Sequence, residues 1–441
     1  MSRRILHRWL LTALLAACAS TFAHGQTIAA GTYTPYSIYG VGDLAQPGNA
    51  FNKSMGGAGV AVRNHNFLNL TNPAAVTARD SLAFMADFSL YNDNKVFKQA
   101  GIRSASNTFN INDLAMSFPI WRSSAMMVGI MPYSDTGFGY SFDYTDPELI
   151  GRTGNITYSA TGTGTIYKAF AAAGVTFFKR LSLGAQWNYY FGNVSKVYST
   201  TFNDASYNGI LNGTTGTLTG SSFKFGMQYE QPVGTKHSIT VGATYTLPTQ
   251  LKGTMESYRY SSGSAASDTL YYKVDQLGKD SKVQLASELA VGVSFQERGR
   301  WMATFDYSRS DWTGSGLDGA RGFTASKVFS ATTSEAFRAG FEIVPNRNDI
   351  RYYFNHVAYR VGAYHKKEYY LLNGNEVRST GVTLGITLPL VFSTNNMNGL
   401  TLGVDFGQRG SLTGDMIRER YVNFSIGFNL FDIWFRKQQY E

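Results

Sequence analysis

The chain has 441 residues, of which 16% are charged, 15% are aromatic and 46 are glycine, and its formal net charge is +9. A typical soluble domain carries about 25% charged residues, and no Lys/Arg-rich block here predicts nucleic-acid binding. Collagen needs glycine at about every third position, disordered chains have few aromatics, and coiled coils are rich in Ala, Glu, Lys and Leu, so all three classes are excluded. Beyond residue 25 no apolar run approaches the ~18 residues of a transmembrane helix, which leaves an all-β protein.

The first 25 residues have the parts of an export signal. A start with three arginines precedes a mostly apolar stretch over 9–22, and a small-x-small cleavage site occupies 23–25. The sole cysteine, Cys18, follows Leu-Ala-Ala, which also fits a lipoprotein signal in which Cys18 would be acylated. We favour ordinary cleavage after Gly25, because Ala and Leu are common in any signal. The mature chain would then contain no thiol.

Residues 26–80 show no strand-like alternation. The stretch is rich in Gly, Asn and Pro, which at this density indicate turns and close approach of backbone. It is also too apolar for a solvated tail. We interpret it as a plug, or hatch, in the lumen of a barrel formed by 81–431, and keep an unfolded periplasmic leader as the alternative.

Period-2 alternation dominates the rest of the chain. Over 181–193 the odd positions are mainly apolar or aromatic, and the even positions are mainly Gly, Ser, Asn and Gln. An aromatic face opposite a small, uncharged polar face, on strands of about ten residues, is typical of a transmembrane antiparallel β-barrel. Fourteen such segments are predicted, at 82–91, 108–119, 123–133, 155–178, 181–193, 219–231, 237–249, 284–296, 301–312, 334–344, 355–368, 378–390, 399–408 and 419–430.

The connections between these segments alternate in length. Short ones, such as 179–180 and 297–300, are expected as periplasmic turns. The long ones are expected as extracellular loops, at 134–154, 194–218, 250–283 and 313–333. The last strand is similar to the C-terminal assembly signal of outer-membrane barrels, and we expect 432–441 to be a periplasmic tail.

Two motifs resemble a known family. Met-Gly-Gly-Ala-Gly-Val-Ala at 55–61, followed by Asn72-Pro73-Ala74, resembles the N-terminal hatch of the FadL/TodX long-chain fatty-acid transporters, and 306–312 is similar to a middle strand of that family. The stretches 36–42, 407–410 and 434–437 resemble a Bacteroidetes-type branch. The resemblance implies a bacterial outer-membrane barrel of fourteen strands whose hatch is held by Gly56, Gly57, Gly59, Asn72, Pro73 and Ala74.

The family also implies a function. A FadL-like barrel would take up a hydrophobic, long-chain fatty-acid-like molecule passively, in contact with outer-membrane lipid and lipopolysaccharide. The alternative is a FadL-like barrel without transport activity, which acts as an interaction subunit of an outer-membrane protein assembly or secretion complex. Such a subunit would bind other outer-membrane or periplasmic proteins. Both hypotheses concern a protein that is not an enzyme.

Charged residues at inward positions are the candidate lumen residues, and a clamp on the hatch is the preferred role over selectivity lining. They are Lys224, Glu230, Asp306, Arg338 and Glu342. The clusters 366–370 and 418–420 are expected at barrel rims, facing lipid phosphates, with a substrate site as the alternative. No catalytic, metal-binding or cofactor-binding motif is found, since the four mature histidines have no zinc signature.

Overall fold

The structure is a computed structural model that describes residues 31–433, except 80–81, 122, 205, 263–266, 324–327, 348, 350, 391–397 and 415. The predicted signal at 1–25, with Cys18, lies outside the described residues, as does the predicted tail from 434 onwards. Within the described chain no helix is long and apolar enough to cross a membrane.

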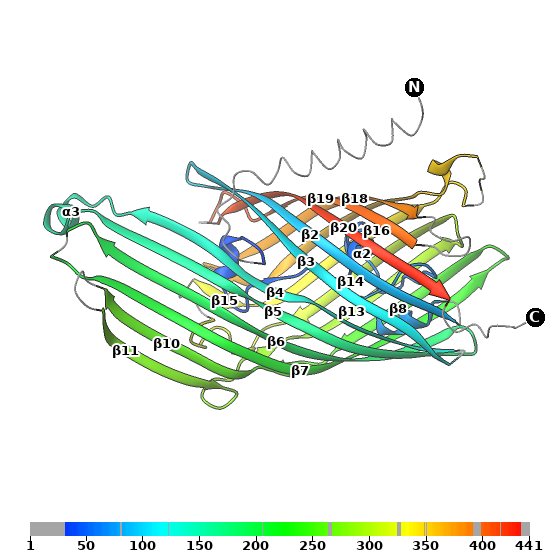
Figure 1. Ribbon diagram of the computed structural model, residues 1–441, viewed down its shortest axis with the longest axis horizontal. Helices are drawn as coiled ribbons and strands as arrows, with labels where there is room; N and C mark the ends of the chain where they lie inside the picture. The colour runs from blue at the N-terminus through cyan, green and yellow to red at the C-terminus, as the bar shows by residue number, and fades with distance from the viewer. Residues whose placement is uncertain are drawn as a thin grey trace, which may run out of the picture.

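Fourteen antiparallel strands of the described chain close into a barrel, which confirms the predicted fold class (Figure 1). Each predicted segment coincides with one strand, and β2 pairs with β20 to close the wall. The barrel strands are β2 (Ala83–Gln99), β3 (Ile102–Trp121), β4 (Ser124–Asp143), β5 (Ile156–Phe177), β6 (Leu181–Phe202), β7 (Gly209–Val233), β8 (His237–Thr246), β13 (Ser287–Glu297), β14 (Trp301–Asp311), β16 (Thr333–Ile343), β17 (Ala358–Leu372), β18 (Asn375–Leu390), β19 (Asn398–Arg409) and β20 (Arg418–Ile433).

The alternation along each strand separates the two faces of the wall. On β6, Trp187 points outward with 45% of its surface exposed, whereas its neighbour Gln186 points inward and is 2% exposed. The outward positions of the neighbouring strands are also apolar, for example Phe223 and Phe225 on β7. The barrel is therefore apolar outside and polar inside, as a lipid-embedded barrel requires.

We call the two ends of the barrel the turn end and the loop end. The turn end carries the short connections 178–180, 234–236 and 298–300, together with the longer 344–357, which contains η3 (Tyr353–Asn355). The loop end carries α3 (Pro147–Thr153) and the longest connections.

Three of the predicted long loops are largely strand. The predicted loops 134–154 and 194–218 are wrong over much of their length, because β4 runs to Asp143, β6 runs to Phe202 and β7 starts at Gly209. The predicted loop 250–283 contains a hairpin of β10 (Lys252–Ser262) and β11 (Ser267–Leu277). β10 pairs with residues 209–219 of β7, at the loop end. Shorter strands of the loop end are β9 (Thr249–Gln250), β12 (Gln284–Leu285) and β15 (Phe329–Ala331).

The stretch that precedes β2, residues 31–79, is called here the N-terminal segment. It contains η1 (Pro35–Ile38), β1 (Asp43–Leu44), α2 (Ala50–Lys53) and η2 (Pro73–Thr77). Most of its side chains are buried against inward-facing residues of the wall. Phe51, Met55 and Phe67, for example, form a buried apolar cluster with Met302 of β14.

Candidate functional site

The Asn-Pro-Ala motif of the N-terminal segment begins η2. The Asn72 side chain caps this helix by accepting a hydrogen bond from the Ala74 N–H at 3.0 Å, and Pro73 occupies the first helical position, where no N–H is needed. The Asn72 amide also donates to the Val60 carbonyl at 2.8 Å. Asn72 therefore joins the motif to the glycine-rich stretch before it.

The glycine-rich stretch packs directly on the wall. Gly56 and Gly57 have φ of 69° and 81°, a region that favours glycine. A Cβ at Gly56 would lie 2.7 Å from the Ala363 carbonyl oxygen of β17. A Cβ at Gly59 would lie 2.4 Å from the Thr71 hydroxyl, within the segment itself. Two of these glycines thus permit tight turns, and Gly56 and Gly59 permit close approach.

The barrel strands also carry glycines, which face inward where the N-terminal segment contacts the wall. Among the described residues, nine strands each present one glycine whose added Cβ would lie within 3.1 Å of an atom of the N-terminal segment. Neighbours in this set lie opposite each other in the ladder, for example Gly184 and Gly226, or Gly340 and Gly362. We call this set the glycine girdle: Gly174, Gly184, Gly226, Gly242, Gly292, Gly340, Gly362, Gly385 and Gly427.

At Gly184, Gly242 and Gly362 the nearest atom of the segment is a backbone atom, which cannot easily move aside. A Cβ at Gly242 would lie 2.3 Å from the Val60 carbonyl oxygen, and one at Gly184 would lie 2.5 Å from the Ala74 amide nitrogen. The segment thus lies closer to these strands than any side chain would allow.

The five charged candidates all face the lumen, but only two bind the N-terminal segment directly. Asp306 accepts hydrogen bonds from the Gly59 N–H at 2.6 Å and the Val60 N–H at 2.8 Å. Glu230 lies 3.4 Å from the Arg63 guanidinium of the segment, and 2.7 Å from that of Arg298.

The other three candidates have different surroundings. Arg338 donates to the Ser308 hydroxyl of the neighbouring strand at 2.8 Å. Glu342 binds Arg360 at 2.6 Å, and the Arg360 guanidinium lies 4.5 Å from the ring centre of Phe51 in the segment. Lys224 lines the central cavity.

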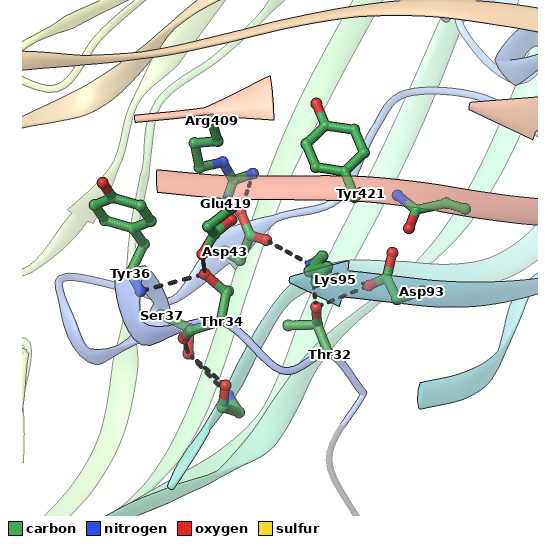
Figure 2. A network of polar contacts seen from close by, with 12 residues as sticks. Thr32, Thr34, Tyr36, Ser37, Asp43, Asp93, Lys95, Arg409, Glu419 and Tyr421 are labelled. Atoms are coloured by element: carbon green, nitrogen blue, oxygen red, sulfur yellow. Dashed lines mark hydrogen bonds and ion pairs between the residues drawn. The ribbon is translucent and has the colours of Figure 1, made fainter. Parts of the chain in front are cut away.

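A polar network at the loop end was not predicted from the sequence (Figure 2). The Arg409 guanidinium lies 2.9 Å from Asp43 of the segment, 3.5 Å from Glu368 of β17 and 3.8 Å from Glu419 of β20. Glu419 also accepts a hydrogen bond from the Thr34 hydroxyl. Arg409 thus joins the segment to three strands.

Lys95 extends this network on β2. Its ammonium lies 3.1 Å from Asp93 and 3.9 Å from Asp43, and it donates to the Thr32 hydroxyl at 2.9 Å. Every one of these charges is paired, as buried charges require.

This network corrects the predicted rim clusters. Glu368 is 1% exposed and Glu419 is 0% exposed, because the inward face of the wall carries them into the lumen. The signal that could have found them is register, since both occupy the lumen parity of their strands.

The wall between β3 and β4 is joined over only part of its height. These strands pair directly from Leu114 to Trp121 on β3, near the turn end. From this point towards the loop end, β3 stays paired with β2 and β4 stays paired with β5, but β3 and β4 no longer pair with each other. We call this gap the seam.

The N-terminal segment occupies the seam. β1 pairs with Ser134 and Asp135 of β4, and the Thr34 N–H donates to the Gly137 carbonyl at 2.7 Å. On the other side of the gap, the Asn110 side chain of β3 donates to the Gly31 carbonyl. The segment therefore bridges the two edges of the gap.

A cavity of about 270 Å³ remains between the segment and the wall. Its lining is strongly charged, with Lys168, Lys224, Glu288, Arg338 and Lys366 added to the network above. Lys53 of α2 also lines it, and burial lowers the pKa of its ammonium to about 8, although Asp113 acts in the opposite direction. Among the described residues no cluster of His, Cys, Asp and Glu side chains could hold a metal ion.

A family model described as BamG matches residues 1–441, the whole chain. The chain belongs to the BamG family. No curated protein matches the sequence.

Solved structures share the fold of this BamG-family chain. The Pseudomonas putida toluene transporter TodX is 13% identical, with a TM-score of 0.56 over 89% of this chain and 99% of its own. The Ralstonia pickettii toluene transporter TbuX is 15% identical, with a TM-score of 0.55 over 87% and 98%. A Pseudomonas aeruginosa FadL homologue is 11% identical, with a TM-score of 0.53 over 88% and 98%.

At these sequence identities the similarity establishes that the chain has a FadL-like fold, but it does not identify a ligand. Together with the BamG family, it places the chain in the bacterial outer membrane. What distinguishes the site is therefore what fills this barrel: a segment packed closely against nine strands of the described chain, and charges on both sides of the remaining cavity.

Proposed function

We propose that this protein is a non-transport interaction subunit of an outer-membrane protein assembly or secretion complex. The observation that carries the proposal is the occupied lumen. The N-terminal segment lies on the glycine girdle of nine strands, counted over the described chain, and also bridges the seam. In this proposal residues 26–80 form a fixed plug, with Gly56, Gly57, Gly59, Asn72, Pro73 and Ala74 shaping it and Asp306 and Glu230 holding it.

The chemistry of the cavity favours this role over passage of a hydrophobic molecule. An apolar solute in the lumen would displace water from Lys224, Arg338, Glu288 and the Arg409 network without offering them hydrogen bonds. Desolvation of charged groups is strongly unfavourable, and ligand sites for apolar molecules are mostly apolar.

Membership in the BamG family supports an outer-membrane assembly context. The partners would be other outer-membrane or periplasmic proteins, with lipid and lipopolysaccharide around the barrel. In this proposal the signal is removed during export, and the turn end faces the periplasm.

Passive uptake of a hydrophobic small molecule, such as a long-chain fatty acid, is the second candidate. The fold favours it, because the similar structures carry the names of toluene transporters and a FadL homologue. Uptake through this barrel would require the segment to leave the girdle or the seam.

Depletion of the protein in its own host separates the two functions. An interaction subunit predicts that several other outer-membrane proteins fall together in abundance, measured by quantitative mass spectrometry of outer membranes. A transporter predicts slower growth on a limiting hydrophobic nutrient with the outer-membrane protein profile unchanged. A plasmid copy of the wild-type gene is the control, and the second result would overturn the proposal.

A further inference from the structure

One side of the barrel wall continues far past the loop end. β5 and β6 have 22 residues each and β7 has 25, whereas β8, β13, β14 and β16 have 10 or 11. About 9–11 residues cross a bilayer, so the long strands project roughly 30 Å beyond it. β10 and β11 widen this projection, which lies at the left of Figure 1. We call it the half-pipe, formed by 134–143, 156–165, 193–202, 209–219, β10 and β11.

Over β4, β5 and β6 the two faces of the half-pipe have the reverse polarity of the barrel. The face that continues the lipid-facing side carries Ser, Thr and Gly, for example Ser141, Thr161 and Ser199. The face that continues the lumen carries aromatic residues, for example Phe138, Tyr158 and Tyr198. A surface in water needs no apolar outer face, so the polar side follows from position, whereas the aromatic inner side requires another explanation.

Part of the aromatic inner face is already covered by polypeptide. Ile38 and Tyr39 of the N-terminal segment pack on Phe138, Ala160 and Tyr198, and Phe138 is fully buried. The segment is also attached by backbone, because Thr34 and β1 add to the free edge of β4 at 134–137.

The inner face beyond this contact is uncovered. Tyr140 is 40% exposed and Phe142 is 48% exposed. Phe142 contacts the rings of Tyr144 and Tyr158 at centroid distances of 5.6 and 5.1 Å, which makes the surface continuous. Over 140–143, β4 pairs with β5 on one side and has no strand partner on its other edge among the described residues.

We propose that the uncovered inner face of the half-pipe is a docking surface for an extended segment of a partner protein outside the membrane. The segment would add to the free edge of β4 and lay aliphatic or tyrosine side chains on Tyr140 and Phe142. An extended segment is the expected occupant because one already covers the adjoining part of this surface. There Ile38 and Tyr39 pack on the aromatic face, and Thr34 hydrogen-bonds to the edge of β4. Addition of a strand to a sheet edge is a common mode of peptide recognition. This inference rests on the proposed function and names the kind of partner.

The test uses the full-length protein, purified by an affinity tag from its native outer membrane in mild detergent. The variant Tyr140→Ser/Phe142→Ser removes the aromatic surface. Ser141→Ala, on the same strand and the opposite face, is the matched control. We expect one surface-exposed partner protein to fall at least about tenfold in the double variant, while the control keeps it. Both variants should keep the wild-type gel shift between unheated and heated samples, which shows that the barrel is folded.

A photo-crosslinking amino acid then identifies the occupant. Placed at position 142 it should attach to that same partner, within a peptide rich in aliphatic or tyrosine residues, and at position 141 it should not. If the double variant keeps every partner, or position 142 attaches to lipopolysaccharide instead, the docking inference is overturned while the proposed function stands. If the wild-type protein purifies without any partner, both are overturned.

Discussion

Trp187 tests which part of the wall lies in the membrane, at the level of one side chain. It lies near the middle of the lipid-facing part of β6, where an arginine costs about 2–4 kcal/mol. We expect Trp187→Arg to lower the free energy of unfolding by that amount, measured by urea titration in detergent micelles. Thr201→Arg is the control, on the same strand and face but beyond the membrane, and should have little effect. Equal losses would show that the assigned membrane level is wrong.

Asp306 tests the attachment of the N-terminal segment. Its carboxylate accepts two backbone hydrogen bonds, and Asp306→Ala leaves both N–H groups without this acceptor, at a cost of about 1–3 kcal/mol each. We expect faster cleavage by trypsin after Arg63, whose side chain is only 10% exposed in the native protein. Asp311→Ala, at the exposed end of the same strand, should leave the cleavage rate unchanged. An unchanged rate in Asp306→Ala as well would contradict a holding role.

At the residue scale, the sequence predicted which charges face the lumen but not what they bind. Alternation assigns Asp306 and Glu230 to the inner face, because parity is a local property of a strand. Glu419 follows Arg409 closely in sequence, but the other two partners, Asp43 of the N-terminal segment and Glu368 of β17, lie far from it. No local pattern contains that information, so its central place in the network could not be predicted.

The glycine girdle gives a prediction at the scale of whole strands. Gly242→Ala places a methyl group against the Val60 carbonyl, so the segment must move or the wall must deform. We expect greater sensitivity to bulky antibiotics in cells that carry this variant. Gly220→Ala is the control, because its nearest neighbour is the flexible Leu251 side chain at 3.3 Å. Identical sensitivity of the two variants would argue against a plug.

Apart from β5, which was predicted over its whole length, the long strands were predicted only where their outer face is apolar. All fourteen barrel strands were found, since lipid contact imposes alternation with aromatic outer positions. The upper part of β6 was missed because its outer positions are Ser195, Ser199 and Thr201 and its inner positions include Tyr198. Side chains still alternate between the two faces there, but the polar residues are outside and the aromatic residues are inside. A search for strands with an apolar outer face therefore stops where the strand leaves the membrane.

At the scale of the whole molecule, a closed strand ladder predicts unusual resistance to detergent. All barrel strands of the described chain are paired on both sides along at least part of their length. We therefore expect unheated and boiled samples to migrate differently on a detergent gel. The control is the same protein unfolded in urea before loading, which should migrate like the boiled sample. Identical migration of all three would contradict the barrel.

Closure of the wall by β2 and β20 fixes the order in which the protein can be built. These are the first and last strands, so the ladder becomes a ring only when the end of the chain arrives. The N-terminal segment immediately precedes β2 and touches strands around most of the ring. We therefore expect the segment to enter the lumen before the last pairing forms. In that order the strands pair around the segment, and a ring that closed first would have to admit the segment through the gap between β3 and β4 or through an end of the barrel.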